Sequence, residues 1–188
     1  MAIKIFIDQG HNPTNPNAGA EGNGLREQDL TYKIGIRLAD LLAADPNYEV
    51  RVSRPSPETQ LGTTNAESLA ARVNAANSWG ADYFISLHAN ASSITSASGS
   101  EAYVYRLGSE AEQFAQNILT GLTDATGLPN RGVFARPTLY VLRRTAMPAT
   151  LIEMGFITNP GDAALMNENP DLFARGMYNG INMYFGLA

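Results

Sequence analysis

The chain has 188 residues, of which 44% are apolar and 16% are charged, as is typical of one globular domain with its own core. The net charge is −5 and no run of Lys or Arg occurs, so neither nucleic acid nor a membrane surface is expected as a partner. The absence of cysteine excludes disulfides and thiolate metal sites, and no segment approaches the length of a membrane span.

The first half of the chain predicts alternating strands and helices. Residues 3–8 read as a buried strand, and a Gly-rich loop at 12–24 leads into a long helix with an apolar residue at every fourth position from Leu30 to Leu42. A strand at 48–53, a polar loop at 54–64 and a helix at 67–79 follow. A second buried strand at 83–87 ends at His88, and a small Ser-rich connector comes after it.

The second half continues the alternation. Ser109 is a predicted helix N-cap, because Glu112 follows it at capping-box spacing. The remaining elements are strands at 101–106, 138–142 and 149–154, and helices from Ser109 to Gly127, after Pro160 and at 170–185. Strands that alternate with helices predict an α/β fold, with a mostly parallel, twisted sheet flanked by helices on both faces. No linker divides the chain, so we expect a single domain over residues 1–188.

Three apolar strands end in residues whose side chains can bind a metal ion or transfer a proton. The strand ends are "FIDQGH" at His11, "YFISLHAN" at His88 and "ATLIEMGF" with Glu153. Parallel strands bring their carboxyl ends to one edge of a sheet, where sites gather. Each histidine alone is more often a turn or structural residue, but a carboxylate among apolar neighbours is costly unless it is paired or bound to a cation.

Two histidines at equivalent strand ends favour a metal site, and imidazole suits zinc, which commonly takes three protein ligands at a catalytic site. Glu27 is the preferred third ligand, because the loop that starts after His11 returns it to the same edge. Taken alone, a glutamate in the first turn of a helix is common, because it interacts favourably with the helix dipole. The acidic candidates are Asp8, Glu21, Glu27, Asp29, Glu101 and Glu153.

With these segments in view, the chain resembles the Amidase_3 family of zinc-dependent N-acetylmuramoyl-L-alanine amidases, found in bacterial cell-wall hydrolases and phage endolysins. The resemblance covers nearly the whole chain, and "SLHAN" followed by "MPATLIEMGFITNP" is its most specific part. The other matching pieces, in family order, are "IFIDQGHNP", "GAEGNGLREQDL", "GSEAYVY", "RGV" and "LYVLRR".

The resemblance implies one Zn²⁺ per chain, held by His11, Glu27 and His88, with Glu153 as the catalytic residue. The implied reaction is hydrolysis of the amide between N-acetylmuramic acid and L-alanine in peptidoglycan. Zinc in such a site acidifies water, and Glu153 accepts and passes on the proton. Asn90 is expected to hold its turn rather than touch substrate, and Glu101 to lie close to the site.

The first motif departs from the family pattern at two positions, both close to the implied ligand His11. The first motif reads Asp-Gln-Gly-His-Asn where the family commonly has Asp-Pro/Ala-Gly-His-Gly, so Gln9 and Asn12 alter the loop around the metal but remove no ligand. Arg72 is expected to form a structural ion pair. The connector between Asn90 and Glu101 is too short to block the metal, so no activator is expected.

Other functions remain open on the sequence alone. A zinc peptidase or carboxypeptidase acting within the stem peptide would use a similar ligand set, and several arginines are available for a terminal carboxylate. An inactive wall-binding domain would be expected to lack a ligand or Glu153, and a glycosidase with two carboxylates would leave the histidines unexplained.

Peptidoglycan is the expected partner and a monomer the expected state, with action outside the cytoplasm or in the cell wall. The first strand begins at Ile3, which leaves no room for a signal peptide, and no wall-binding module is recognisable. Export of a longer form and release by lysis therefore both remain open.

Overall fold

A six-stranded sheet forms the centre of the molecule, with strand order β4-β1-β5-β8-β6-β7. The computed structural model describes residues 2–187. Strands β4, β1, β5 and β8 run parallel, whereas β6 is antiparallel to β8 and parallel to β7. The strands are β1 Ile3–Gln9, β4 Tyr48–Val52, β5 Tyr83–Asn90, β6 Ser100–Val104, β7 Asn130–Ala135 and β8 Ala149–Phe156. The predicted α/β fold with a mostly parallel sheet is confirmed.

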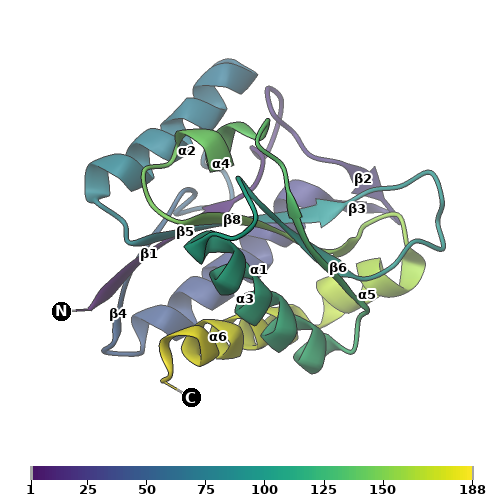
Figure 1. Cartoon of the computed structure of the whole chain (residues 1–188). Coiled ribbons are helices and arrows are strands. Elements are labelled where there is room, and N and C mark those ends of the chain that lie inside the picture. The colour runs from purple at the N-terminus through teal and green to yellow at the C-terminus, as the bar shows by residue number, and fades with distance from the viewer. Residues whose placement is uncertain (1, 188) are drawn as a thin grey trace.

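Helices cover both faces of this sheet (Figure 1). Helices α1, α3 and α6 pack on one face, over side chains such as Ile7, Leu87 and Ile152, and α2 and α4 lie on the other, over Phe84 and Leu151. The helices are α1 Glu27–Ala43, α2 Asn65–Trp79, α3 Glu110–Thr126, α4 Tyr140–Arg144, α5 Pro160–Glu168 and α6 Pro170–Phe185. Among residues 2–187, none of these helices is both long and apolar enough to cross a membrane.

Local sequence accounts for several helix ends. The side chain of Ser109 accepts a hydrogen bond from the Glu112 amide at 3.4 Å, as the capping-box spacing predicts. Thr64 caps α2 in the same way. Gly127 ends α3 in the left-handed conformation, at φ 71°.

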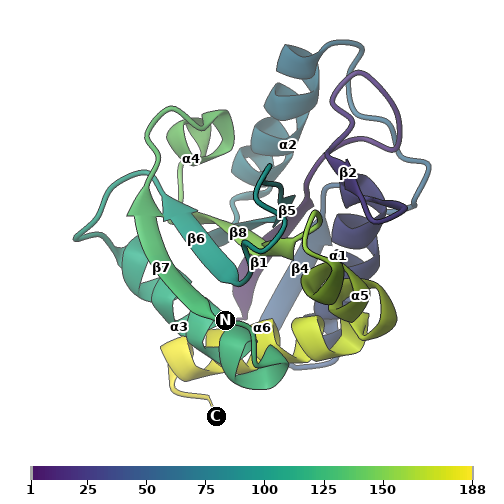
Figure 2. The same cartoon turned by 90° about the vertical axis from the view of Figure 1, so that its right-hand side faces the viewer.

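The predicted strand at 138–142 is wrong, because this segment forms the short helix α4. The place beside β6 is taken instead by β7, at the edge of the sheet (Figure 2). After β7 the chain crosses back over the sheet, and α4 buries Val141 and Leu142 against the cluster that contains Phe84. Burial against a neighbouring element therefore overrides the local strand preference.

A small hairpin that was not expected begins within the predicted loop at 12–24 and ends just after it. Strands β2 Glu21–Gly22 and β3 Leu25–Arg26 pair antiparallel around Asn23 and Gly24, which both have positive φ. Asn-Gly favours this kind of tight turn, so the sequence carried a signal for it. The hairpin ends directly before Glu27, the first residue of α1.

Candidate metal centre

The three predicted ligands lie together at the carboxyl ends of β1 and β5. His11 follows β1, Glu27 opens α1 and His88 lies near the end of β5. Their ligand atoms all lie within 4.8 Å of one another. Oε1 of Glu27 is 3.1 Å from Nε2 of His11 and 3.0 Å from Nδ1 of His88, so one carboxylate oxygen lies beside both imidazoles.

Backbone amides fix the carboxylate of Glu27. The Ala20 N–H donates to Oε2 at 2.9 Å, and the Ala89 N–H donates to Oε1 at 3.0 Å. Burial opposes ionisation, but the hydrogen bonds from His11 and His88 outweigh it and hold the pKa of Glu27 well below its ordinary value. Glu27 therefore carries a negative charge between the two histidines at neutral pH.

Two glycines make room for this cluster. A Cβ at Gly10 would lie 2.5 Å from the Leu87 carbonyl oxygen and 2.6 Å from the His88 ring. A Cβ at Gly19 would lie 2.7 Å from Oε2 of Glu27. Neither position stands out in the sequence, although both lie in the segments that bring His11 and Glu27 to the site. Their role depends on contacts between distant segments.

The donor set and its spacing fit one small divalent metal ion. Two imidazole nitrogens and one carboxylate oxygen are ligands that such ions commonly take. Metal–ligand bonds of about 2.0–2.2 Å place neighbouring ligands of a tetrahedral ion about 3.3 Å apart. The distances of 3.1 and 3.0 Å from Oε1 of Glu27 are close to that spacing.

Glu153 lies next to this cluster on the same face of the sheet. It is paired in register with His88 on β5 and with Glu101 on β6. Its Oε2 is buried and has no hydrogen-bond partner among the described residues. Burial raises the pKa of Glu153 to about 8, and the carboxylates of Glu27 and Glu101 add to the rise. The structure thus places a carboxyl group with no hydrogen-bond partner for Oε2 and a raised pKa beside the candidate metal ligands.

Glu101, on strand β6 beside Glu153, is held by hydrogen bonds from several side chains. The Asn90 side chain donates to Oε1 of Glu101 at 2.9 Å, and Arg131 Nε donates to Oε2 at 2.8 Å. The Tyr103 hydroxyl also donates to Oε1. Burial opposes ionisation, but Tyr103 and Arg131 hold the pKa of Glu101 below its ordinary value. Glu101 is thus a fixed negative charge near Glu153.

Arg72 forms the expected ion pair, with Asp8 as its partner. Nη1 of Arg72 lies 2.6 Å from Oδ1 of Asp8, and both side chains are only 1% exposed. Arg54, which we placed in a polar loop, is also fully buried. No periodicity in the sequence marked it, because its side chain binds backbone carbonyl groups, two of them in distant segments.

A cavity of about 140 Å³ opens beside His11 and His88. It lies between α2 and α4, and its apolar lining comes from Leu69, Leu139, Tyr140, Val141 and Leu151. A larger hollow of about 310 Å³, beside Arg106 and Arg143, touches none of the candidate ligands. The smaller cavity therefore offers apolar surface directly next to the candidate metal centre.

The chain matches one family of known proteins over nearly its whole length. The family model described as N-acetylmuramoyl-L-alanine amidase, Amidase_3, matches residues 5–183. The N-acetylmuramoyl-L-alanine amidase CwlM of Bacillus licheniformis is 37% identical over 99% of this chain and 70% of its own length.

Solved structures show the same fold. The catalytic domain of CwlV, an N-acetylmuramoyl-L-alanine amidase from Bacillus (Paenibacillus) polymyxa var. colistinus, has a TM-score of 0.85 and 29% identity over 99% of both chains. The CwlD amidase from Clostridioides difficile, solved in complex with the GerS lipoprotein, has a TM-score of 0.89 and 22% identity over 99% of this chain and 100% of its own. With the family model matching nearly the whole sequence, the chain belongs to the Amidase_3 family of N-acetylmuramoyl-L-alanine amidases.

Proposed function

We propose that residues 1–188 are the catalytic domain of a zinc-dependent amidase that cleaves the bond between N-acetylmuramic acid and L-alanine in bacterial peptidoglycan. Membership of the amidase family supports the reaction. The observation that carries the site is the convergence of His11, Glu27 and His88 within 4.8 Å, beside the unpaired carboxyl of Glu153.

His11, Glu27 and His88 are the proposed zinc ligands. Because only one of them is negative, the site would keep a net positive charge when it holds a divalent ion. Zinc at this position would acidify a water molecule, polarise the scissile carbonyl and lower the pKa of the nearby Glu153. The backbone bonds to Glu27 keep its carboxylate turned towards the two imidazoles.

Glu153 is the proposed general base and acid. It accepts a proton from the attacking water at its unpaired oxygen and donates a proton to the departing amine of L-alanine. Burial, together with the carboxylates of Glu27 and Glu101, raises the pKa of Glu153 to about 8, which supports a role in proton transfer near neutral pH. Glu101, held by Asn90 and Arg131, contributes to that raised pKa and is proposed to act only through it.

A carboxypeptidase acting within the stem peptide is the main alternative. It would need a free cation for the terminal carboxylate, and Arg131, which is near the site, already donates to Glu101. The family match favours the amidase. The wall-binding alternative is disfavoured by the same match and by the convergence of all three candidate ligands beside Glu153.

Product analysis separates these reactions. Purified peptidoglycan is digested with the protein, and new amino ends are identified by dinitrophenylation. The amidase predicts new L-alanine amino ends and free lactyl carboxyl groups on muramic acid. New ends within the stem peptide, or release of a terminal D-alanine alone, would contradict it. Glu153→Ala, which removes the proposed base, is the inactive control.

We also propose that the domain acts outside the cytoplasm, as a monomer, and without an activator. The connector between β5 and β6 is tied to the segment after β8: the Ser92 N–H donates to Thr158 at 3.0 Å, and the Ser98 hydroxyl donates to Asp162 at 2.6 Å. These bonds support an open site. A many-fold rise in the cleavage rate on adding a partner protein would contradict this proposal.

A further inference from the structure

His11 is held differently from the other two candidate ligands. Glu27 receives two backbone hydrogen bonds, and His88 lies within the paired part of β5. His11 lies beyond the end of β1 in the left-handed conformation, at φ 69°, which is uncommon for a residue other than glycine. Its Nδ1 is buried without a hydrogen-bond partner among the described residues.

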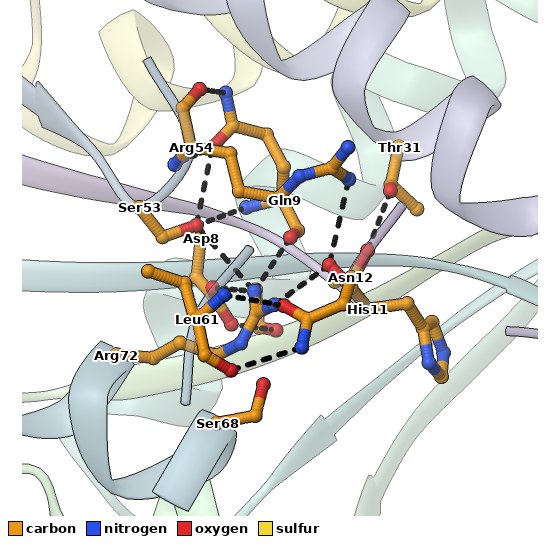
Figure 3. Close-up of polar contacts among 12 residues, drawn as sticks. Asp8, Gln9, His11, Asn12, Thr31, Ser53, Arg54, Leu61, Ser68 and Arg72 are labelled. Atoms are coloured by element: carbon orange, nitrogen blue, oxygen red, sulfur yellow. Dashed lines mark hydrogen bonds and ion pairs between the residues drawn. The ribbon is translucent and has the colours of Figure 1, made fainter. Parts of the chain in front are cut away.

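That free ring nitrogen is unusual for a metal ligand. A ligating histidine commonly donates its second ring N–H to an oxygen, which fixes the direction of the ring. His11 has no such bond, so its backbone must set that direction. Figure 3 shows the His11 ring pointing away from a dense polar network that surrounds its backbone.

Arg72 makes the shortest bonds of this network to the backbone of the first motif. Its Nη2 donates to the His11 carbonyl oxygen at 2.6 Å, and its Nη1 donates to the Gln9 carbonyl oxygen at 2.6 Å. Nη2 also reaches Oδ1 of Asn12 at 3.2 Å. A single guanidinium from α2 thus binds groups on both sides of His11, in addition to its ion pair with Asp8.

Arg54 connects the same carbonyl to α1. Its Nη1 donates to the Gln28 carbonyl oxygen at 2.9 Å and to the His11 carbonyl oxygen at 3.4 Å, and its Nη2 donates to Pro57 at 2.9 Å. Gln28 directly follows Glu27, so Arg54 joins the backbones of two candidate ligands. Its burial lowers the pKa of Arg54 to about 10, and the charge of Arg72 adds to this.

A purely structural role accounts poorly for Arg54. The side chain is fully buried, and among residues 2–187 no carboxylate lies within ion-pair distance of it. Burying an unpaired charge is costly, and a packed apolar side chain commonly serves stability as well or better. The hydrogen bonds of its guanidinium go to backbone carbonyl groups, one of them on His11, and its remaining partner is the ring face of Tyr32, with the guanidinium carbon 5.4 Å from the ring centroid.

We propose that Arg54 and Arg72 are positioning residues that hold the His11 carbonyl and thereby direct its imidazole towards the metal. This inference rests on the proposed metal centre. In other metal sites a hydrogen bond from the second ring nitrogen fixes the direction of the imidazole. In His11 the two guanidiniums fix this direction by binding the backbone carbonyl. Neither arginine contacts the candidate ligand atoms of Glu27 or His88.

Arg72→Lys and Arg54→Lys test this proposal, because lysine keeps the positive charge but has one nitrogen in place of the planar fork. The zinc Kd of each folded variant is measured by competition with a chromophoric chelator, and the Co²⁺-loaded protein gives a visible absorption spectrum that reports ligand geometry. Ser86→Ala is the matched control, because Ser86 donates to Asp8 at 2.7 Å and makes no contact with His11.

We expect the zinc Kd of Arg72→Lys to rise about tenfold to a hundredfold, with a changed Co²⁺ spectrum. Arg54→Lys is expected to raise the zinc Kd and change the Co²⁺ spectrum in the same direction but to a smaller extent, because the bond from Arg54 to the His11 carbonyl is longer. Ser86→Ala should keep the wild-type Kd and spectrum even if its unfolding temperature falls.

A folded Arg72→Lys variant with the zinc Kd and Co²⁺ spectrum of wild type would overturn the proposal. A Ser86→Ala variant whose zinc affinity falls as much as that of Arg72→Lys would overturn it as well. If Arg72→Lys does not fold, Arg54→Lys decides the question by the same two readouts. The metal centre itself is tested separately with His11→Ala. If wild type and His11→Ala bind zinc equally well, the ligand assignment fails, rather than the role of the arginines.

Discussion

At the scale of single residues, the carboxyl groups of Glu27 and Glu153 lie in environments that shift their pKa values in opposite directions. Glu27 is held by two backbone amides and its pKa is lowered, whereas Oε2 of Glu153 is buried without a partner and the pKa of Glu153 is raised to about 8. One carboxylate is thereby kept charged as a ligand, and the other is left able to gain and lose a proton. Acid–base roles commonly follow from such opposed environments.

Glu153→Gln should abolish most of the activity without unfolding the protein. The amide cannot accept a proton, so the cleavage rate is expected to fall by about 10²–10⁴-fold. Because the substitution replaces a buried, unpaired carboxyl group, the unfolding temperature of the metal-free protein should not decrease. Dye release from labelled peptidoglycan and thermal unfolding are the measurements, with the exposed Glu58→Gln as control. Near wild-type rates in Glu153→Gln would disprove its role.

The buried ion pair of Asp8 and Arg72 should make the free energy of unfolding depend on pH in the acidic range. Burial opposes ionisation of Asp8, but Arg72 and Ser86 outweigh it and hold its pKa below the ordinary value. The stabilisation is therefore present above the unfolded-state pKa of about 3.9 and is lost as the pH falls through the lower folded-state pKa.

Asp8→Asn measures this contribution. At pH 7 it leaves Arg72 buried without a counter-charge, and should cost about 3–5 kcal/mol of unfolding free energy. The difference from wild type in urea unfolding should narrow below about pH 4. A difference that stays constant down to the acid limit of folding would show that Asp8 ionisation does not contribute.

Short motifs made the candidate ligands predictable, but not what holds them. The two histidines and Glu153 stand in recognisable positions after apolar strands, so the sequence alone brought them to one edge. Arg54 looked like part of a polar loop, because its three acceptors are backbone carbonyl groups from separate segments. Side-chain types do not report such contacts.

At the scale of elements, helices α3 and α6 depend on glycine for their close approach. A Cβ at Gly180 would lie 2.6 Å from the Cα of Ile118 and still closer to the Asn117 carbonyl oxygen. Gly121 and Gly176 meet the facing backbone in the same way. The obstacles are backbone atoms, so the helices themselves would have to move apart.

Gly180→Ala should therefore destabilise the protein by about 1–3 kcal/mol through overpacking. Asn179→Ala, on the exposed side of the same helix, introduces the same side chain without that contact and should be nearly neutral. Urea unfolding of both variants provides the comparison. Equal stability of the two would show that α6 can shift without cost.

Element prediction failed where neighbours decide the structure. Strand β7 has half-exposed and exposed residues without clear alternation, and it forms because β6 offers an unpaired edge. The segment at 138–142 has the apolar content of a strand, but β7 already occupies the edge of β6, and the segment forms helix α4 instead. The long amphipathic helices and the buried strands β1, β5 and β8 were predictable because their patterns are strong on their own.

At the scale of the whole molecule, one face of the sheet carries the larger part of the apolar core and the other face carries the candidate site. Helices α1, α3 and α6 cover one face with the larger apolar cluster. On the other face, α2 and α4 flank the cavity beside His11 and His88, and Glu153 lies on the strand between. With a net charge of −5, the domain gains no attraction to an anionic wall, so binding to substrate must come from this face or from another module.

The most direct test of the account is zinc titration of the chelator-treated protein. Cleavage of labelled peptidoglycan is followed while zinc is added, in wild type and in His11→Ala, Glu27→Ala and His88→Ala. The account predicts no activity without metal, recovery that reaches its plateau at one zinc per chain, and no recovery at that ratio in the three variants. Activity that survives metal removal, or full recovery in any of these variants, would contradict a zinc centre formed by His11, Glu27 and His88.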